Sequence, residues 1–169
     1  MPFAILGTPR SRTAWFARFL KCEHEPSRHW ASLADVYAYF KPEAGASDSM
    51  LTLHWRELAK ITNMRIVVIV RPLDQVVRSA LNAGLTNGVG PLLRIYAAIA
   101  EIASHRAIPI VAYDALTPEK CAEIFTYLLK LPCPQDWLRM CDVPITADTE
   151  AVFRDAKVNE SGLRGFYGV

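Results

Sequence analysis

The cysteines of this 169-residue sequence lack the spacing of a metal or redox centre: there is no C-x-x-C pair, and no histidine lies near a cysteine at zinc-site spacing. Nothing in the sequence indicates export, so we expect reduced, structural thiols and no disulfide framework. The four positions are Cys22, Cys121, Cys133 and Cys141. We therefore expect no metal site.

Long apolar runs are missing as well. None approaches the roughly 18 residues that a membrane-spanning helix requires. The N-terminus enters a strand-like segment directly, without the charged, apolar and small-residue regions of a secretory signal. These absences predict a cytoplasmic protein that does not interact with membranes.

A large excess of one charge is also absent: the sequence has 19 Lys and Arg residues and 17 Asp and Glu residues, which gives a net charge of +2. The basic residues are spread along the chain and do not form the broad basic face of a nucleic-acid-binding protein. The composition, 51% hydrophobic and 21% charged, is that of a globular protein. We expect one domain over residues 1–169 and no nucleic-acid partner, while leaving room for individual anion sites.

The most informative stretch is at the start of the chain, where the apolar run 3–6 breaks into the polar turn Gly7-Thr8-Pro9-Arg10-Ser11-Arg12 and continues as an amphipathic segment. This pattern predicts a strand, an anion-binding loop and a helix, since a helix N-terminus presents unpaired N–H groups and a favourable dipole to an anion. The loop lacks the Gly-Lys-Ser/Thr ending that binds nucleoside triphosphates with magnesium. An ordinary buried strand with a basic turn remains the alternative.

Alternating strand and helix patterns continue through the chain. β-branched or apolar runs predict strands at 66–70 and 108–113, and a short strand is expected around 46–49. Helical patterns cover 13–21, 32–40, 51–61, 75–83, 92–104, 118–131 and 135–141, with caps at Ser32, Asp74 and Thr117. This order predicts an α/β fold: a three-layer, P-loop-like domain with a mostly parallel central sheet flanked by helices. Its ligand should lie beyond the carboxyl ends of the strands.

Polar residues from distant parts of the chain should meet at that edge of the sheet. The turn 10–13, Asp48, Arg71 and Tyr113 each follow a predicted strand. On the helix after Arg71, Arg78 and Ser79 could complete a second phosphate clamp, for which a planar guanidinium is well suited. Two clamps on one ligand favour a nucleotide phosphorylated at two positions.

These segments resemble the sulfotransferases that use 3'-phosphoadenosine 5'-phosphosulfate. The match comprises residues 7–15 and 65–79, with 111–116 similar to a later strand of the family. The resemblance implies that Arg10 contacts the 5'-phosphosulfate, that Trp15 stacks on adenine, that Arg71 and Ser79 hold the 3'-phosphate and that Tyr113 lies near the base. The implied donor-binding residues are Thr8, Pro9, Arg10, Ser11, Arg12, Thr13, Ala14, Trp15, Arg71, Ser79 and Tyr113. Because Trp15 also fits a core position, both roles remain open.

The sequence departs from the family at two points. Arg12 replaces a glycine that is usual in better-known members, and the C-terminal Arg-Lys-Gly block has only a faint echo in Leu163-Arg164-Gly165. The resemblance implies a metal-independent enzyme that transfers a sulfuryl group from 3'-phosphoadenosine 5'-phosphosulfate to a hydroxyl or amine. Its partner is a small-molecule or macromolecular acceptor, and the apolar helices leave room for a homodimer.

Sulfuryl transfer needs a base to take the proton of the acceptor. The candidates are His24, Glu25, Asp48 and His54, with Arg10 as the residue that stabilises the transferred group. Asp48 and His24 rank slightly ahead because His54 falls inside a helical pattern, and each also fits a purely structural role. Two other functions stay open: a nucleotide-binding protein without catalysis, and a P-loop nucleotide or small-molecule kinase.

Overall fold

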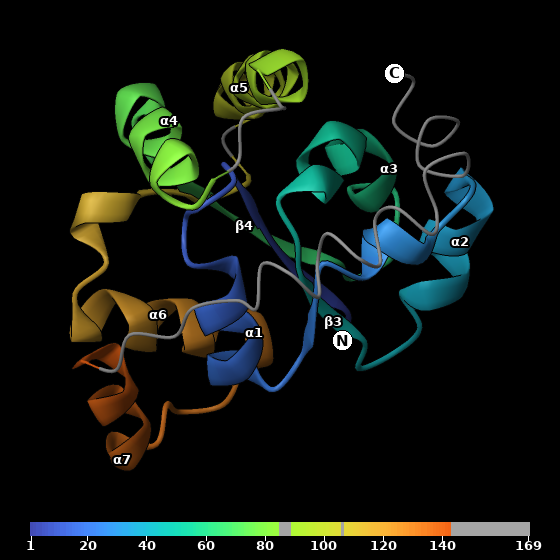
Figure 1. Ribbon diagram of the computed structural model, residues 1–169. Helices are drawn as coiled ribbons and strands as arrows, with labels where there is room; N and C mark the ends of the chain where they lie inside the picture. The colour runs from blue at the N-terminus through green and yellow to red at the C-terminus, as the bar shows by residue number, and fades with distance from the viewer. Residues whose placement is uncertain (85–88, 106, 143–169) are drawn as a thin grey trace.

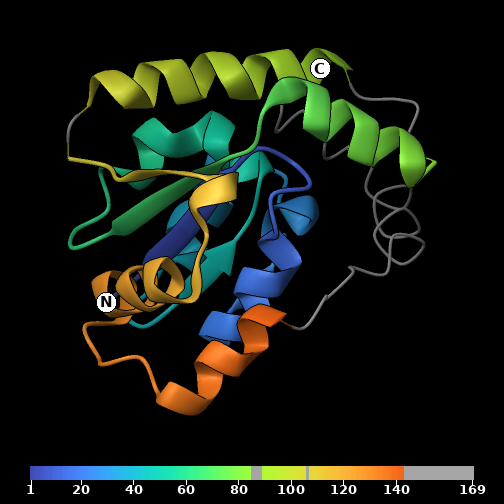
Figure 2. The same cartoon turned by 90° about the vertical axis from the view of Figure 1, so that its left-hand side faces the viewer.

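In the part of the chain that the structure describes, five strands form one parallel sheet with helices on both faces, as the computed structural model shows (Figures 1 and 2). The structure describes residues 1–84, 89–105 and 107–142. The strand order is β2-β3-β1-β4-β5. The strands are β1 (Phe3–Gly7), β2 (Glu23–His24), β3 (Gly45–Ser47), β4 (Arg65–Val70) and β5 (Ile110–Ala112). The predicted three-layer α/β fold with a mostly parallel sheet is thus confirmed.

Helical segments separate the strands along the chain. The α-helices are α1 (Thr13–Leu20), α2 (Leu33–Tyr39), α3 (Trp55–Leu58), α4 (Leu73–Asn82), α5 (Val89–Ser104), α6 (Pro118–Leu129) and α7 (Gln135–Leu138). The 3-10 helices are η1 (Pro26–His29), η2 (Met50–His54), η3 (Tyr113–Ala115) and η4 (Arg139–Asp142). Two expected caps are present. Ser32 and Asp35 form a capping box on α2, and Thr117 accepts a hydrogen bond from the backbone N–H of Lys120 at 3.3 Å.

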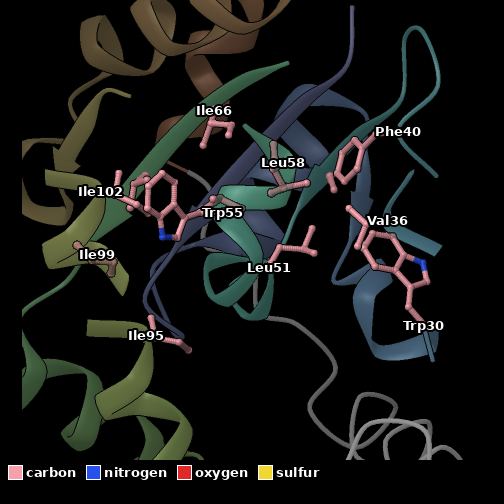
Figure 3. Packing of buried hydrophobic residues seen from close by; sticks show 14 residues of the cluster. Trp30, Val36, Phe40, Leu51, Trp55, Leu58, Ile66, Ile95, Ile99 and Ile102 are labelled. Carbon is pink, nitrogen blue, oxygen red and sulfur yellow. The ribbon is translucent and has the colours of Figure 1, made fainter. Parts of the chain in front are cut away.

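Each face of the sheet has its own core. In β1, Ile5 packs with Phe16 and Phe19 of α1 and with α6, whereas Leu6 belongs to the cluster on the other face. Figure 3 shows that second cluster, in which Leu51 and Leu58 lie between the residues of the α2 region and the Trp55–Ile102 group. Alternate residues of one strand therefore serve two cores, as expected for a central strand covered on both sides.

The structure differs from the sequence-based expectations at three points, the first two of which depend on tertiary contacts. The expected helix 51–61 is divided into η2 and the four-residue α3. Thr52 of η2 is held against β1: its Oγ1 accepts from Gly7 N at 2.9 Å and donates to Gly7 O at 3.1 Å. The strand β2 was not expected, because two residues are too few to show the periodicity of a strand. Only the pairing of Glu23 and His24 with β3 makes this segment a strand. Asp74 does not cap α4: Pro72 is its N-cap and Asp74 lies in the first turn.

Gly7 occupies a position that only glycine tolerates. Its φ is +152°, and an added Cβ would lie 2.0 Å from the carbonyl oxygen of Ile69. The chain leaves β1 in this close approach to β4, and Thr8 N then donates to Ile69 O at 3.1 Å. This glycine therefore allows the following loop to begin directly beside the end of β4.

Among the described residues, no helix combines the length and the apolar character that crossing a bilayer requires. Leu163-Arg164-Gly165, the faint echo of the family's C-terminal block, lies outside the described residues.

Candidate functional site

The carboxyl ends of all five strands meet at one edge of the sheet, because every pairing is parallel. A polar residue follows each strand directly. In the order of the sheet these residues are Glu25, Asp48, Thr8, Arg71 and Tyr113. The convergence expected at this edge is therefore present, and Glu25 joins it because β2 forms the outer strand next to β3.

The chain leaves β1 and β4 toward opposite faces of the sheet. After β1 it forms α1, which packs on Ile5, whereas after β4 it reaches α5, whose Ile95 and Ile102 pack on the opposite face with Leu6. In an open parallel sheet, such a reversal opens a crevice between the two neighbouring strand ends, where ligands bind. Here the crevice lies between the loop 8–12 and Arg71.

A cleft of about 490 Å³ opens beside this crevice, against α4. Its lining is polar and rich in cations, and the residues are Arg10, Arg71, Asp74, Gln75, Arg78, Ser79, Asn82 and Ala83. Arg10 Nε donates to Ser79 Oγ at 3.2 Å, which joins the two predicted clamps in one space. Within the described part of the chain, no ion pair neutralises the guanidinium groups of Arg10 or Arg71. This arrangement favours an anionic ligand.

The loop between β1 and α1 is rigidly organised by its own hydroxyl groups. Thr8 and Ser11 are fully buried; Thr8 Oγ1 accepts from Arg71 N at 3.0 Å, and Ser11 Oγ donates to Thr8 O. They were expected to contact the ligand, but here their side chains shape the loop. Arg10 and Arg12 both adopt positive φ, 62° and 67°. Such conformations cost about 1–3 kcal/mol each and persist only where surrounding contacts impose them.

Arg71 is held in place from several directions. Its Nη1 donates to Arg10 O at 2.9 Å and its Nε to Gln75 Oε1 at 3.2 Å, while its guanidinium carbon lies 4.4 Å from the centre of the Tyr113 ring. From α5, the Tyr96 hydroxyl donates to Arg71 O. The guanidinium is therefore pre-oriented beside the cleft, which reduces the entropy lost on binding a phosphate.

The two aromatic residues expected near the base differ in their environment. Trp15 is only 2% exposed and stacks on Phe19 with ring centres 4.6 Å apart. The burial and stacking support the core alternative for Trp15, and the guanidinium carbon of Arg12 lies 5.9 Å from its ring centre. Tyr113 is half-buried, and Arg12 lies 5.6 Å from its ring centre in addition to Arg71. Tyr113 is thus the aromatic side chain closest to the cationic residues.

Of the remaining loop residues, Pro9, Arg12 and Ala14 are half-buried and Thr13 is 7% exposed. Thr13 opens α1, and its Oγ1 lies 3.2 Å from His24 Nε2 at the end of β2. His24 Nε2 is in turn 3.8 Å from Glu25 Oε1. Thr13 therefore links the loop between β1 and α1 to two of the candidate bases, His24 and Glu25.

Glu25 has the acid–base properties that proton transfer requires. Burial, followed by the neighbouring Asp48 carboxylate, raises the pKa of Glu25 to about 7, and the charge of Arg10 acts in the opposite direction. Its side chain is 23% exposed, so it remains accessible. Burial lowers the pKa of His24, which favours the neutral form of its imidazole. A carboxyl group that titrates near neutral pH beside an anion site is suited to general-base catalysis.

Asp48 has a different environment. It is fully buried, and its oxygens accept backbone N–H bonds from Ser27 at 3.0 Å, Met50 at 2.8 Å and Leu51 at 3.2 Å. Burial raises the pKa of Asp48, while these hydrogen bonds oppose that rise. The carboxylate oxygens of Asp48 are engaged in hydrogen bonds that fix η1 and η2. Asp48 is therefore better placed to influence the pKa of Glu25 than to contact a substrate.

His54 lies apart from this group. It ends η2, which packs against β1 and α5, and the charged groups that act on its pKa are Arg94 and Glu57. Burial lowers the pKa of His54, and nearby Arg94 acts in the same direction. Its position supports the structural alternative.

Two residues that hold Arg71 in place were not predicted. Gln75 stands four residues after Arg71, a helical spacing that could have indicated the contact. Tyr96 could not have been found in this way, because its link to Arg71 depends on how α5 packs.

Comparison with protein-family models, with curated proteins and with solved structures gives no match for this chain.

Proposed function

We propose that the protein is a sulfotransferase that transfers a sulfuryl group from 3'-phosphoadenosine 5'-phosphosulfate to a hydroxyl or amine acceptor. The observation that carries this proposal is the meeting of Arg10, Arg71 and Ser79 around one cleft at the crevice between β1 and β4. These three residues come from the two segments that resemble the family. Their convergence supports a ligand with two anionic groups.

In the proposed reaction, Arg71 and Ser79 hold the 3'-phosphate and Arg10 contacts the transferred group. A sulfuryl group carries less charge than a phosphoryl group, so one guanidinium and the loop N–H groups can stabilise it as it moves. The acceptor oxygen or nitrogen forms a bond to sulfur while the bond between sulfur and the bridging phosphate oxygen breaks. The electron pair of that bond leaves with 3',5'-adenosine bisphosphate.

Glu25 takes the acceptor proton in this scheme. Its pKa of about 7 keeps a substantial fraction ionised at neutral pH and able to accept the proton. Arg10 connects the two halves of the site, since it contacts Ser79 in the cleft and lowers the pKa of Glu25. An anion bound at Arg10 offsets the positive charge of Arg10 and so raises the pKa of Glu25. The carboxylate of Glu25 is therefore a stronger base when the donor is present.

Calorimetric titration tests the binding half of the proposal. The wild-type protein should bind 3',5'-adenosine bisphosphate at least ten-fold more tightly than adenosine 5'-monophosphate, because only the bisphosphate engages both clamps. Arg71→Lys keeps the charge but loses the fork that contacts Gln75 and Arg10, and should weaken bisphosphate binding by roughly ten-fold or more. Arg56→Lys is the matched control, since exposed Arg56 pairs with Glu101 and does not line the cleft.

Equal affinity for the two nucleotides would contradict the two-clamp proposal. The same titration tests the kinase alternative, and a turnover assay tests the non-catalytic alternative. Magnesium-dependent binding of ATP in preference to the bisphosphate would favour a kinase. Tight bisphosphate binding without turnover over a panel of hydroxyl and amine acceptors would favour a nucleotide-binding protein that lacks catalysis.

A further inference from the structure

Helix α4 carries an apolar stripe that the rest of the described structure leaves exposed. Leu73, Val77 and Leu81 are 41%, 37% and 59% exposed, and they recur every four residues on one side of the helix. Val76 is the one residue of α4 that is buried. The cleft residues Gln75 and Ser79 occupy another side, and two further cleft residues, Asp74 and Arg78, lie between that side and the stripe. In both views α4 lies beside α5 at the periphery of the molecule (Figures 1 and 2). A long apolar row at such a position marks an interaction surface.

One edge of the stripe carries two opposite charges, one helical turn apart. Asp74 and Arg78 are 70% and 76% exposed, and Arg78 Nη2 lies 3.9 Å from Asp74 Oδ2. At that exposure and distance the ion pair within the helix is weak. Both side chains therefore keep most of their capacity for a partner outside the helix.

This surface is complementary to itself. A two-fold axis across α4 at Val77 brings Val77 against its own copy and Leu73 against Leu81 of a second chain. The same rotation brings the edge that carries Asp74 and Arg78 next to its own copy in the opposite direction. Each Asp74 then faces Arg78 of the second chain, which gives two equivalent ion pairs. Self-complementarity of this kind is what an isologous interface requires.

We propose that α4 is a homodimer interface in which two copies of this chain pack their α4 helices antiparallel through Leu73, Val77 and Leu81. Three exposed apolar side chains from each copy bury less than the roughly 800 Å² per partner of a standard stable interface. The dimer is therefore weak and concentration-dependent, with a dissociation constant on the order of 10–100 µM.

Sedimentation velocity on the full chain, over about 1 to 300 µM, tests the proposal through a charge exchange. Asp74→Arg makes the edge of the stripe entirely positive, and Arg78→Asp makes it entirely negative. Each variant alone should self-associate roughly ten-fold more weakly than the wild type, because like charges then face each other. An equimolar mixture should form a heterodimer, since every positive edge then meets a negative one. Wild-type-like association of both single variants, or no recovery in the mixture, overturns the proposal.

Val77→Asp provides the second test, at the axis itself. It places two carboxylates in contact across the dimer and should abolish association, while the exposed position leaves the fold intact. Leu33→Asp is the matched control: Leu33 is 43% exposed at the start of α2, on the opposite side of the molecule from α4 (Figure 1). Circular dichroism and the unfolding midpoint verify folding of both variants. A wild-type protein that stays monomeric at 300 µM, or equal loss of association in both variants, overturns the proposal.

Discussion

The Nε atom of Arg10 lies 3.2 Å from the hydroxyl oxygen of Ser79, although 69 positions separate the two residues in the sequence. Arg10 belongs to the loop after β1, and Ser79 belongs to the helix after β4. This contact exists because β1 and β4 are parallel neighbours whose carboxyl ends meet at one edge. It converts two short sequence motifs into one cationic cleft, on which the proposed function rests.

The first prediction concerns the pH dependence of stability through Glu25. Its pKa is raised from 4.5 to about 7 in the folded protein, so the folded state holds the proton more tightly than the unfolded chain. The associated stabilisation is fully present below about pH 4.5 and is lost as pH rises through about 7. Glu25→Gln should not show this loss. The unfolding free energy of the variant minus that of the wild type should therefore increase by on the order of 1–3 kcal/mol between pH 5 and 8.

Urea denaturation at a series of pH values measures this difference. Exposed Glu43→Gln is the control and should run parallel to the wild type. The lowered pKa of His24 has the opposite sign and makes stability rise with pH toward 6.5. This contribution is common to the wild type and Glu43→Gln, whereas Glu25→Gln also changes the group that lies 3.8 Å from His24 Nε2. A constant difference between Glu25→Gln and the wild type over this range would contradict the raised pKa of Glu25.

The second prediction separates a structural from a catalytic role for Asp48. Asp48→Ala leaves the N–H groups of Ser27, Met50 and Leu51, two of them in buried hydrogen bonds, without their acceptor. We expect a loss of about 3–5 kcal/mol in unfolding free energy. Asp35→Ala, which removes an exposed cap from α2, should cost only about 1 kcal/mol. Chemical denaturation of both variants measures the comparison, and similar costs would show that Asp48 does not organise η1 and η2.

The third prediction concerns the close approach at Gly7. Gly7→Ala combines positive φ with a Cβ placed 2.0 Å from Ile69 O, whereas Gly84→Ala has a φ of +72° and no atom within 4 Å. The Gly84 variant isolates the conformational cost, about 1 kcal/mol. The Gly7 variant should lose several kcal/mol more, because backbone atoms of β4 must move. If both variants unfold at the same urea concentration, the contact with Ile69 does not constrain the end of β1.

The fourth prediction distinguishes Trp15 from Tyr113. Trp15→Ala removes a buried ring that stacks on Phe19 and should cost about 3–5 kcal/mol in unfolding free energy. Tyr113→Leu removes the ring beneath Arg71 and should cost about 1 kcal/mol or less. In calorimetry with 3',5'-adenosine bisphosphate, however, Tyr113→Leu should weaken binding several-fold, since Arg71 loses its support. A Trp15→Ala protein of wild-type stability would show that Trp15 is not a core residue.

Much of the fold followed from local physical chemistry. The β-branched run before Arg71 is continuous, which is typical of a strand buried on both faces of a sheet. Ser32 and Asp35 form the capping hydrogen bonds of α2 with residues of the same local segment. Because a parallel sheet places all strand ends at one edge, the meeting of the loop 8–12 with Arg71 could also be predicted.

Other features could not be predicted because they depend on contacts between distant elements. No local pattern around Glu25 indicates a shifted pKa; burial beside Asp48, directly after the two-residue strand β2, raises the pKa of Glu25 to about 7. Trp15 fitted a ligand-stacking role and a core role equally well, and the packing of Phe19 favours the second.

The sequence by itself thus determined the parallel α/β architecture and the cationic strand ends, since these depend on periodicity and on the order of elements. The tertiary structure decided which hydroxyls shape the loop, which acid titrates near neutral pH and which side of α4 stays exposed. Each of those properties is set by burial and by neighbours from other elements, for which a linear pattern carries no signal.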